Sequence, residues 1–90
     1  MTIKRHKFFR KDELKVKLTD EQYKKKIEYL SYILDNKSLP NEALDHPLAG
    51  EYKGFREFHL SGDILIIYTI KDNILYLQRI GTHSQLFKKY

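Results

Sequence analysis

Three strand-like segments joined by very short connections constrain the fold of this 90-residue chain more than any other feature. Residues 55–60 alternate in polarity, residues 64–70 form an almost unbroken apolar run, and residues 74–80 are again mostly apolar. Ser61-Gly62 and Asp72-Asn73 are the turn signals between them. Connections this short join only antiparallel neighbours, so the sequence predicts a three-stranded meander.

The length of the second turn decides which face carries Arg79, because a slip of one residue moves every side chain to the other face. A two-residue Asp72-Asn73 loop pairs Lys71 with Ile74 and Ile66 with Arg79. A three-residue loop would turn Arg79 to the opposite face. The two-residue loop is favoured because Asp and Asn tolerate the left-handed backbone it needs.

The first turn sets the register of the carboxylate Glu57. If Leu60 pairs with Asp63, then Glu57 also pairs with Ile66, and Glu57, Ile66 and Arg79 form one row. His59 lies on the same face as Glu57, since strand side chains alternate. The other face is expected to be apolar and to receive the helices: Phe58, Leu60, Leu65, Ile67 and Ile80.

The first half of the chain reads as helical. Residues 1–18 predict a short strand and then a helix. Thr19 and Gln22 have the spacing of a capping box, so a helix is expected to begin there and to end at residues 35–38 before Pro40. Its predicted buried stripe is Tyr23, Ile27, Leu30 and Leu34. The predicted fold class is α+β, with two N-terminal helices packed on a small, mainly antiparallel sheet, and with residues 40–54 as a loop.

Charge and composition narrow the class of protein further. The net charge is +5, and residues 1–18 hold seven of the 17 basic residues but only two of the 12 acidic ones. Such a basic patch attracts phosphate backbones or an acidic protein. The chain has no cysteine and no apolar run long enough to span a membrane, which predicts a cytoplasmic protein. Its length predicts a single domain, residues 1–90.

The histidines are the candidate catalytic residues. His46, His59 and His83 lie in the second half together with the acids Glu57 and Asp63. The meander brings His59 and Asp63 to one end of the sheet with Arg79, and His83 follows directly after its last strand. Histidines beside carboxylates suit acid–base work. A cross-strand ion pair between Glu57 and Arg79 is the plainer alternative.

Such a set can cleave RNA without a metal, because the 2′-OH is the nucleophile. A base must take its proton, an acid must protonate the leaving 5′ oxygen, and a cation must face the phosphate oxygens. Tyr52, Phe55 and Phe87 could stack on bases. The chain has neither the histidine spacing of a zinc protease nor a glycine-rich phosphate loop, so no metal or cofactor is expected.

Ordered motifs in residues 39–87 resemble the YafQ type of the RelE/ParE toxin superfamily. They are Asp45-His46-Pro47-Leu48, Gly50, Lys53-Gly54, Arg56-Glu57-Phe58-His59, Asp63 with Leu65-Ile66-Ile67-Tyr68, and Arg79-Ile80-Gly81-Thr82-His83-Ser84-Gln85-Leu86-Phe87. The resemblance implies a RelE-like α+β fold. It also implies a ribosome-dependent endoribonuclease that cuts mRNA and belongs to a toxin–antitoxin pair. One departure is Gly62-Asp63-Ile64, where Pro-Asp-Trp is common.

The resemblance also assigns roles to residues. It implies a catalytic set of His46, His59, Asp63 and His83, with Glu57 where the pattern often has aspartate. Asp63 or His59 would be the base and His83 the acid. The implied substrate-binding residues are Lys53, Arg56, Arg79 and Phe87, although Arg56 falls on the other face of its strand and has a structural role as its alternative.

The resemblance leaves two other functions open. One is a ParE-like toxin that inhibits DNA gyrase without an acid–base set, and the other is a plain RNA-binding module. The histidines favour the ribonuclease over both. The expected partners are a cognate antitoxin in a hetero-oligomeric complex, the ribosome and mRNA.

Overall fold

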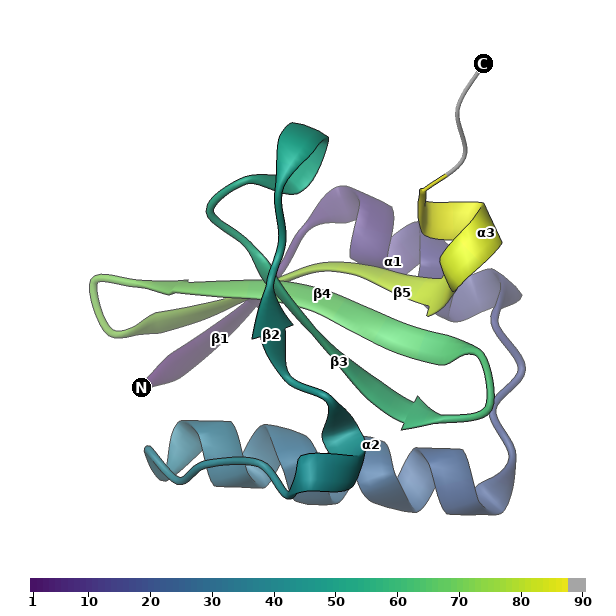
Figure 1. Cartoon of the computed structure of the whole chain (residues 1–90), viewed down its shortest axis with the longest axis horizontal. Coiled ribbons are helices and arrows are strands. Elements are labelled where there is room, and N and C mark those ends of the chain that lie inside the picture. Colours follow the sequence, from purple (N-terminus) through teal and green to yellow (C-terminus); the bar gives the residue numbers. More distant parts are fainter. Residues whose placement is uncertain (88–90) are drawn as a thin grey trace.

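The structure, a computed structural model, describes residues 1–87 and shows helices around a five-stranded sheet (Figure 1). The strands are β1 (Thr2–Arg5), β2 (His46–Pro47), β3 (Arg56–Ser61), β4 (Ile64–Lys71) and β5 (Ile74–Thr82). The helices are α1 (Lys7–Lys15), α2 (Asp20–Leu34) and α3 (His83–Leu86), with two 3₁₀ turns, η1 (Asn41–Ala43) and η2 (Gly50–Tyr52).

The strand order is β1-β5-β4-β3-β2, with β1 parallel to β5 and the other neighbours antiparallel. Helix α2 runs along one face of the sheet, below it in Figure 1, while α1 packs against β5 and α3 follows the end of β5. The predicted α+β class, the strand and helix within residues 1–18 and the C-terminal meander are confirmed. The expected loop at residues 40–54 instead contains β2 and both 3₁₀ turns.

Helix α2 begins with the predicted capping box, in which Thr19 and Gln22 exchange hydrogen bonds of 3.1 and 3.0 Å. Of the predicted buried stripe, Leu30 and Leu34 pack partly buried against the core, but the other two positions were predicted wrongly. Tyr23 and Ile27 are 55% and 56% exposed. The buried residues are Gln22, Tyr29 and Ile33. The helix is rotated because Gln22 donates to the Ser61 carbonyl at 3.1 Å and Tyr29 packs edge-on against Phe58.

The predicted two-residue loop between β4 and β5 is confirmed. Asp72 and Asn73 both have left-handed backbone angles, with φ of 53° and 61°, and Lys71 pairs with Ile74 across them. These are the angles of the hairpin turn whose twist matches that of the flanking strands.

The first turn of the meander lies one residue further along than predicted. Gly62 and Asp63 form it, and Ser61 pairs with Ile64. The predicted pair of Leu60 and Asp63 is therefore wrong. Leu60 is instead the extra residue of a bulge in β3.

A second bulge, which leaves Gln78 unpaired in β5, shifts the other hairpin in the same direction. Glu57 and Arg79 consequently both pair with Ile67, not with Ile66 as predicted. They share one face, as expected, but Ile67 and Leu65 lie on that face as well. The face covered by α2 instead carries Ile66 and its buried strand neighbours: Phe58, Leu60, Tyr68, Leu75, Leu77 and Ile80. Phe9 of α1 and Tyr29 of α2 join them in one core cluster.

Within residues 1–87, no helix combines the length and the apolar character that crossing a membrane requires.

Candidate active site

A buried carboxylate, Glu57, lies between two histidines on the face away from α2. Its side chain is 4% exposed, and its Oε2 is 2.9 Å from Nε2 of His59 and 3.8 Å from Nε2 of His46. His59 is on the same strand two residues later, so both side chains point to one face. The short strand β2 brings His46 in, because His46 pairs directly with Glu57.

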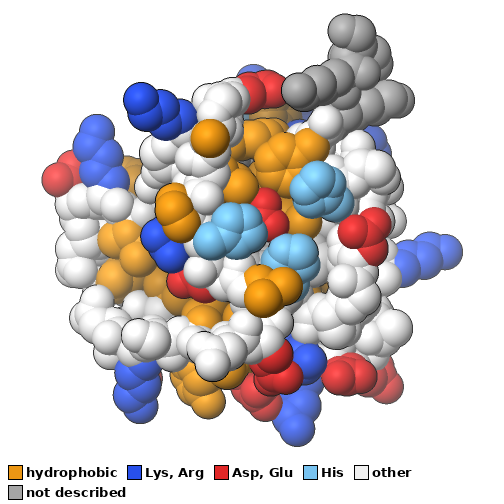
Figure 2. All heavy atoms as spheres, viewed as in Figure 1, with side chains coloured by type: hydrophobic (Ala, Val, Ile, Leu, Met, Phe, Trp, Pro, Cys, Tyr) orange, Lys and Arg blue, Asp and Glu red, His pale blue; other side chains and the backbone are white. Residues whose placement is uncertain are grey.

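His46 is held by a hydrogen bond through one ring nitrogen. Its Nδ1 donates to the carbonyl of Leu44, which has a left-handed backbone with φ of 52°. The other ring nitrogen, Nε2, is the one that faces Glu57. The rings of His46 and His59 stack with centroids 6.5 Å apart. Figure 2 shows histidine side chains gathered on one face of the molecule.

His83 begins α3, directly after β5. A second capping box, between Thr82 and Gln85, fixes this short helix. The ring of His83 lies 4.6 Å from that of Phe87, and Phe87 meets Tyr52 of η2 edge-on at 5.5 Å. The predicted histidine and aromatic residue are thus in contact, and Tyr52 supports them from the other side.

Helix α3 docks on the sheet face that carries Glu57. Leu86, 5% exposed, forms a small apolar cluster with Leu65 and Ile67. Gly81 lies opposite Leu65 and lets α3 approach, since a Cβ at this position would meet Gln85 Oε1 at 2.9 Å. The position of His83 therefore depends on a glycine two residues earlier.

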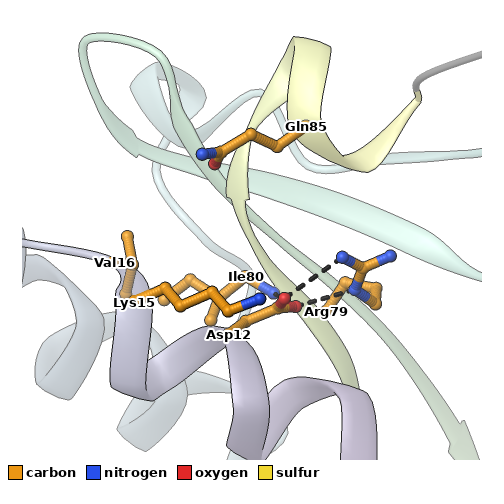
Figure 3. A pocket seen from close by; sticks show the side chains of 6 residues that line it. All are labelled: Asp12, Lys15, Val16, Arg79, Ile80 and Gln85. Carbon is orange, nitrogen blue, oxygen red and sulfur yellow. Dashed lines mark hydrogen bonds and ion pairs between the residues drawn. The ribbon is translucent and has the colours of Figure 1, made fainter.

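Arg79 is on the same face but does not pair with Glu57. Its Nε and Nη2 donate to the two carboxylate oxygens of Asp12 in α1, at 2.7 and 3.1 Å (Figure 3). The Glu57–Arg79 ion pair, which was the plainer alternative to acid–base work, is not among the salt bridges of the described residues. The hydrogen bonds to Asp12 raise the pKa of Arg79, burial opposes that rise, and the Tyr52 hydroxyl adds to it.

Asp63 and Lys53 lie at exposed positions. Asp63 is in the turn between β3 and β4, and Lys53 follows η2. Neither makes a side-chain hydrogen bond or ion pair among the contacts of residues 1–87. Both are thus accessible to a large substrate, and neither is oriented by a neighbouring side chain.

Arg56 lies on the opposite face of β3 and makes a structural contact. Its Nε donates to Asp45 at 3.1 Å, and the Tyr68 hydroxyl donates to the same carboxylate oxygen at 2.7 Å. Burial lowers the pKa of Arg56, but the hydrogen bonds to Asp45 and Tyr68 raise it by more. This pair fastens the segment before His46 to the sheet.

Sequence reasoning missed Asp12 as a neighbour of the site. It lies 67 residues from Arg79, and its spacing in α1 gives no local signal. The structure also offers no metal centre among residues 1–87, where no group of three or more His, Asp or Glu side chains is arranged to hold an ion.

Two N-terminal helices on a mixed sheet, with a histidine–carboxylate cluster on one sheet face, define a toxin of the RelE-like fold. The family model described as "Bacterial toxin of type II toxin-antitoxin system, YafQ" matches residues 1–88. The chain belongs to this YafQ family.

Individual relatives agree with this assignment. The chain is 42% identical over 76 residues to the mRNA interferase toxin YafQ of Escherichia coli strain K12, covering 80% of this chain and 83% of that protein. The crystal structure of YafQ from E. coli strain BL21(DE3) has a TM-score of 0.83 at 30% identity and covers 94% and 96% of the two chains. A crystal structure of the E. coli DinJ-YafQ complex matches with a TM-score of 0.80 at 31% identity, over the same shares.

Proposed function

We propose that this toxin is an mRNA interferase, an endoribonuclease that cleaves mRNA on the ribosome by metal-independent acid–base attack of the 2′-OH. The observation that carries the proposal is the carboxylate of Glu57, buried between His46 and His59 on a face that also receives His83. The relative from E. coli strain K12 carries the name mRNA interferase toxin, which supports the same activity.

Glu57 is suited to orienting a histidine. It is nearly inaccessible, and its Oε2 is 2.9 Å from His59, so a substrate hydroxyl would have to displace that ring to reach it. A carboxylate in this position fixes the ring and its tautomer and stabilises the imidazolium that forms when the ring takes a proton. His59 then serves as the base for the 2′-OH, with the exposed Asp63 as the alternative base.

His83 is the proposed acid for the leaving 5′ oxygen. It is exposed at the start of α3, where a proton donor can reach a bound strand. Phe87, in contact with the His83 ring, offers an aromatic surface for a neighbouring base. Arg79 supplies the cation near the phosphate oxygens, and His46 Nε2 adds a second imidazole nitrogen beside Glu57.

The remaining predicted residues contribute to binding rather than to proton transfer. Exposed Lys53 and the lysines of residues 1–18 attract the RNA backbone without regard to sequence. Arg56 acts through Asp45, by holding the segment that carries His46.

The proposed partners are a cognate antitoxin, the ribosome and mRNA, and the proposed location is the cytoplasm. The E. coli DinJ-YafQ toxin-antitoxin complex supports an antitoxin that binds the toxin directly. An acidic partner would be attracted to the basic N-terminal segment, given the net charge of +5.

Primer extension on translating ribosomes tests the activity. The wild-type toxin should cut mRNA, and His59→Ala and His83→Ala should each lower cleavage by a factor of about 10² or more, as loss of a general acid or base does. The matched control is His6→Asn, because His6 caps α1 by accepting from the Phe8 N–H and asparagine is an equally good cap. It should cut like the wild type.

Two results would contradict the proposal. One is undiminished cleavage by both the His59 and the His83 variants while the proteins remain folded. The other is a wild-type toxin that does not cut mRNA but inhibits gyrase in a supercoiling assay, which would assign the chain to the ParE-like activity.

A further inference from the structure

Asp12 makes more side-chain hydrogen bonds than the proposed reaction itself explains. Its carboxylate accepts from Arg79 Nε at 2.7 Å, from Arg79 Nη2 at 3.1 Å and from the backbone N–H of Ile80 at 3.1 Å. The Asp12 side chain is 14% exposed. It lies in α1, a helix that contributes none of the proposed catalytic histidines (Figure 3).

Asp12 can contact the backbone of β5 because the edge of this strand has no strand partner there. Strand β1 pairs with β5 only as far as Leu77, and the last backbone hydrogen bond on that side runs from His6 to Leu77. Beyond this point the N–H of Ile80 has no strand beside it. The Asp12 carboxylate satisfies that donor, as a strand carbonyl would have done.

The same carboxylate determines how Arg79 is presented. A guanidinium has five N–H donors in a fixed planar fork, and Asp12 uses the Nε and Nη2 side of it. Asp12 does not bind the Nη1 donors. The fork cannot rotate without breaking two charge-assisted hydrogen bonds, so the direction of those donors is fixed.

The presented side of Arg79 belongs to the proposed site. Arg79 and Glu57 pair with the same residue, Ile67, and therefore share a face. The Tyr52 hydroxyl, which faces Arg79, is on the ring that packs against Phe87. Asp12 is thus connected to the His83–Phe87 end of the site through a single arginine.

We propose that Asp12 is a positioning residue for RNA cleavage, which holds Arg79 so that the Nη1 donors that Asp12 does not bind face the scissile phosphate. Asp12 does not touch the substrate. The inference rests on the proposed ribonuclease function and adds to it a residue from α1, outside the histidine cluster.

A purely structural role for Asp12 would have a different signature. The bond to the Ile80 N–H stabilises the fold whether or not Arg79 is present, whereas positioning acts only through Arg79. A double-mutant cycle separates the two roles, because effects that pass through one shared group are not additive.

The experiment measures single-turnover cleavage on mRNA-programmed ribosomes and thermal unfolding for Asp12→Ala, Arg79→Ala and the double variant. Asp12→Ala should slow the saturating rate by a factor of about 10 to 10², the cost of a group displaced by about 1 Å, with little change in the ribosome concentration at half-saturation. Arg79→Ala should slow it at least as much. The double variant should be no slower than Arg79→Ala but less stable.

Glu13→Ala is the matched control. Glu13 is the next residue of α1 and binds Arg5 at 2.9 Å and Lys26 at 3.3 Å, away from Arg79. Its loss should lower the melting temperature and leave cleavage unchanged. If the wild type cleaves and Asp12→Ala cleaves equally fast, or if the two losses of rate add in the double variant, the positioning role is overturned and the ribonuclease function stands. A wild-type toxin that does not cleave would overturn the ribonuclease function as well.

Discussion

Replacing Gly81 by alanine should displace α3 and with it the proposed acid His83. Gly81 lies in β5 opposite Leu65, directly beneath α3. An added Cβ would lie 2.9 Å from Gln85 Oε1 and 3.3 Å from Leu86 Cδ2. The first distance is a clash that requires movement, and the second is tighter than ordinary contact.

The cost follows from what has to move. Gln85 Oε1 accepts the Thr82 N–H at 3.0 Å, so rotating Gln85 away breaks half of the capping box, worth about 0.5–1.5 kcal/mol. Leu86 is packed against Leu65 and Ile67, and overpacking such a site costs about 1–3 kcal/mol. The smaller entropy of an alanine-containing unfolded chain returns about 0.4–1 kcal/mol. The net loss should be about 2 kcal/mol, within a range of about 0.5–4 kcal/mol, and a loss of about 2 kcal/mol lowers the melting temperature of a domain of this size by roughly 8–16 °C.

Thermal unfolding and ribosomal cleavage should respond unequally to Gly81→Ala. A shift of about 1 Å in His83 and Phe87 should lower the cleavage rate by a factor of about 10², far more than the small unfolded fraction explains. In a Gln85→Ala background the same change should cost less stability, because the nearest clashing atom is gone. Wild-type stability and wild-type cleavage in Gly81→Ala would refute the close approach of α3 and the dependence of His83 on it.

Three further changes test other parts of the structure. Tyr68→Phe should lower the free energy of unfolding by about 1 kcal/mol at neutral pH. Because burial and then Asp45 raise the Tyr68 pKa above 10.0, the wild type should lose stability above pH 10 more steeply than the variant. Equal slopes of stability against pH for the two proteins would contradict this. Thr19→Ala should cost about 1 kcal/mol in urea unfolding and leave cleavage unchanged, and a loss of cleavage would show that this cap is coupled to the site. Glu57→Gln keeps an oxygen for His59 but no charge, so cleavage should fall by a factor of about 10 or more while the fold persists; full activity would exclude the orienting role.

Local patterns accounted for the elements and their order. The Asp72-Asn73 loop and the capping box at Thr19 follow from the backbone angles and hydrogen-bonding groups of a few adjacent residues, and both are confirmed. Bulges are different, because they depend on how two strands twist against each other. No local pattern signals Leu60 or Gln78 as the unpaired residue.

The two bulges explain why the predicted face of the site was right although the predicted register was wrong. In β3 the later turn alone would pair Glu57 with Tyr68, and the Leu60 bulge brings the partner back to Ile67. In β5 the Gln78 bulge moves the partner of Arg79 from Ile66 to Ile67. A single bulge would have left these two residues on opposite faces. Strand β4 is almost uniformly apolar and lacks an alternating pattern, so its sequence does not show which of its residues lie beneath the site.

Contacts between residues far apart in the chain could not be predicted from the sequence. His46 reaches Glu57 through a strand of only two residues, which no periodicity can reveal. Asp12 reaches Arg79 because α1 crosses the open edge of β5, a consequence of where β1 stops pairing.

The difference in burial between Glu57 and Asp63 gives the two carboxylates different roles. Glu57 already has His59 at 2.9 Å and is closed off from solvent, so it can fix a ring but is poorly placed to meet a substrate hydroxyl. Asp63 is exposed in a turn, and among residues 1–87 no side chain hydrogen-bonds to it, so within this part of the chain its position is set by the Gly62-Asp63 backbone. An accessible base needs both reach and a fixed direction, and His59 has both: it is a quarter exposed and is oriented by Glu57. Between the two candidate bases that the sequence left open, the geometry therefore favours His59.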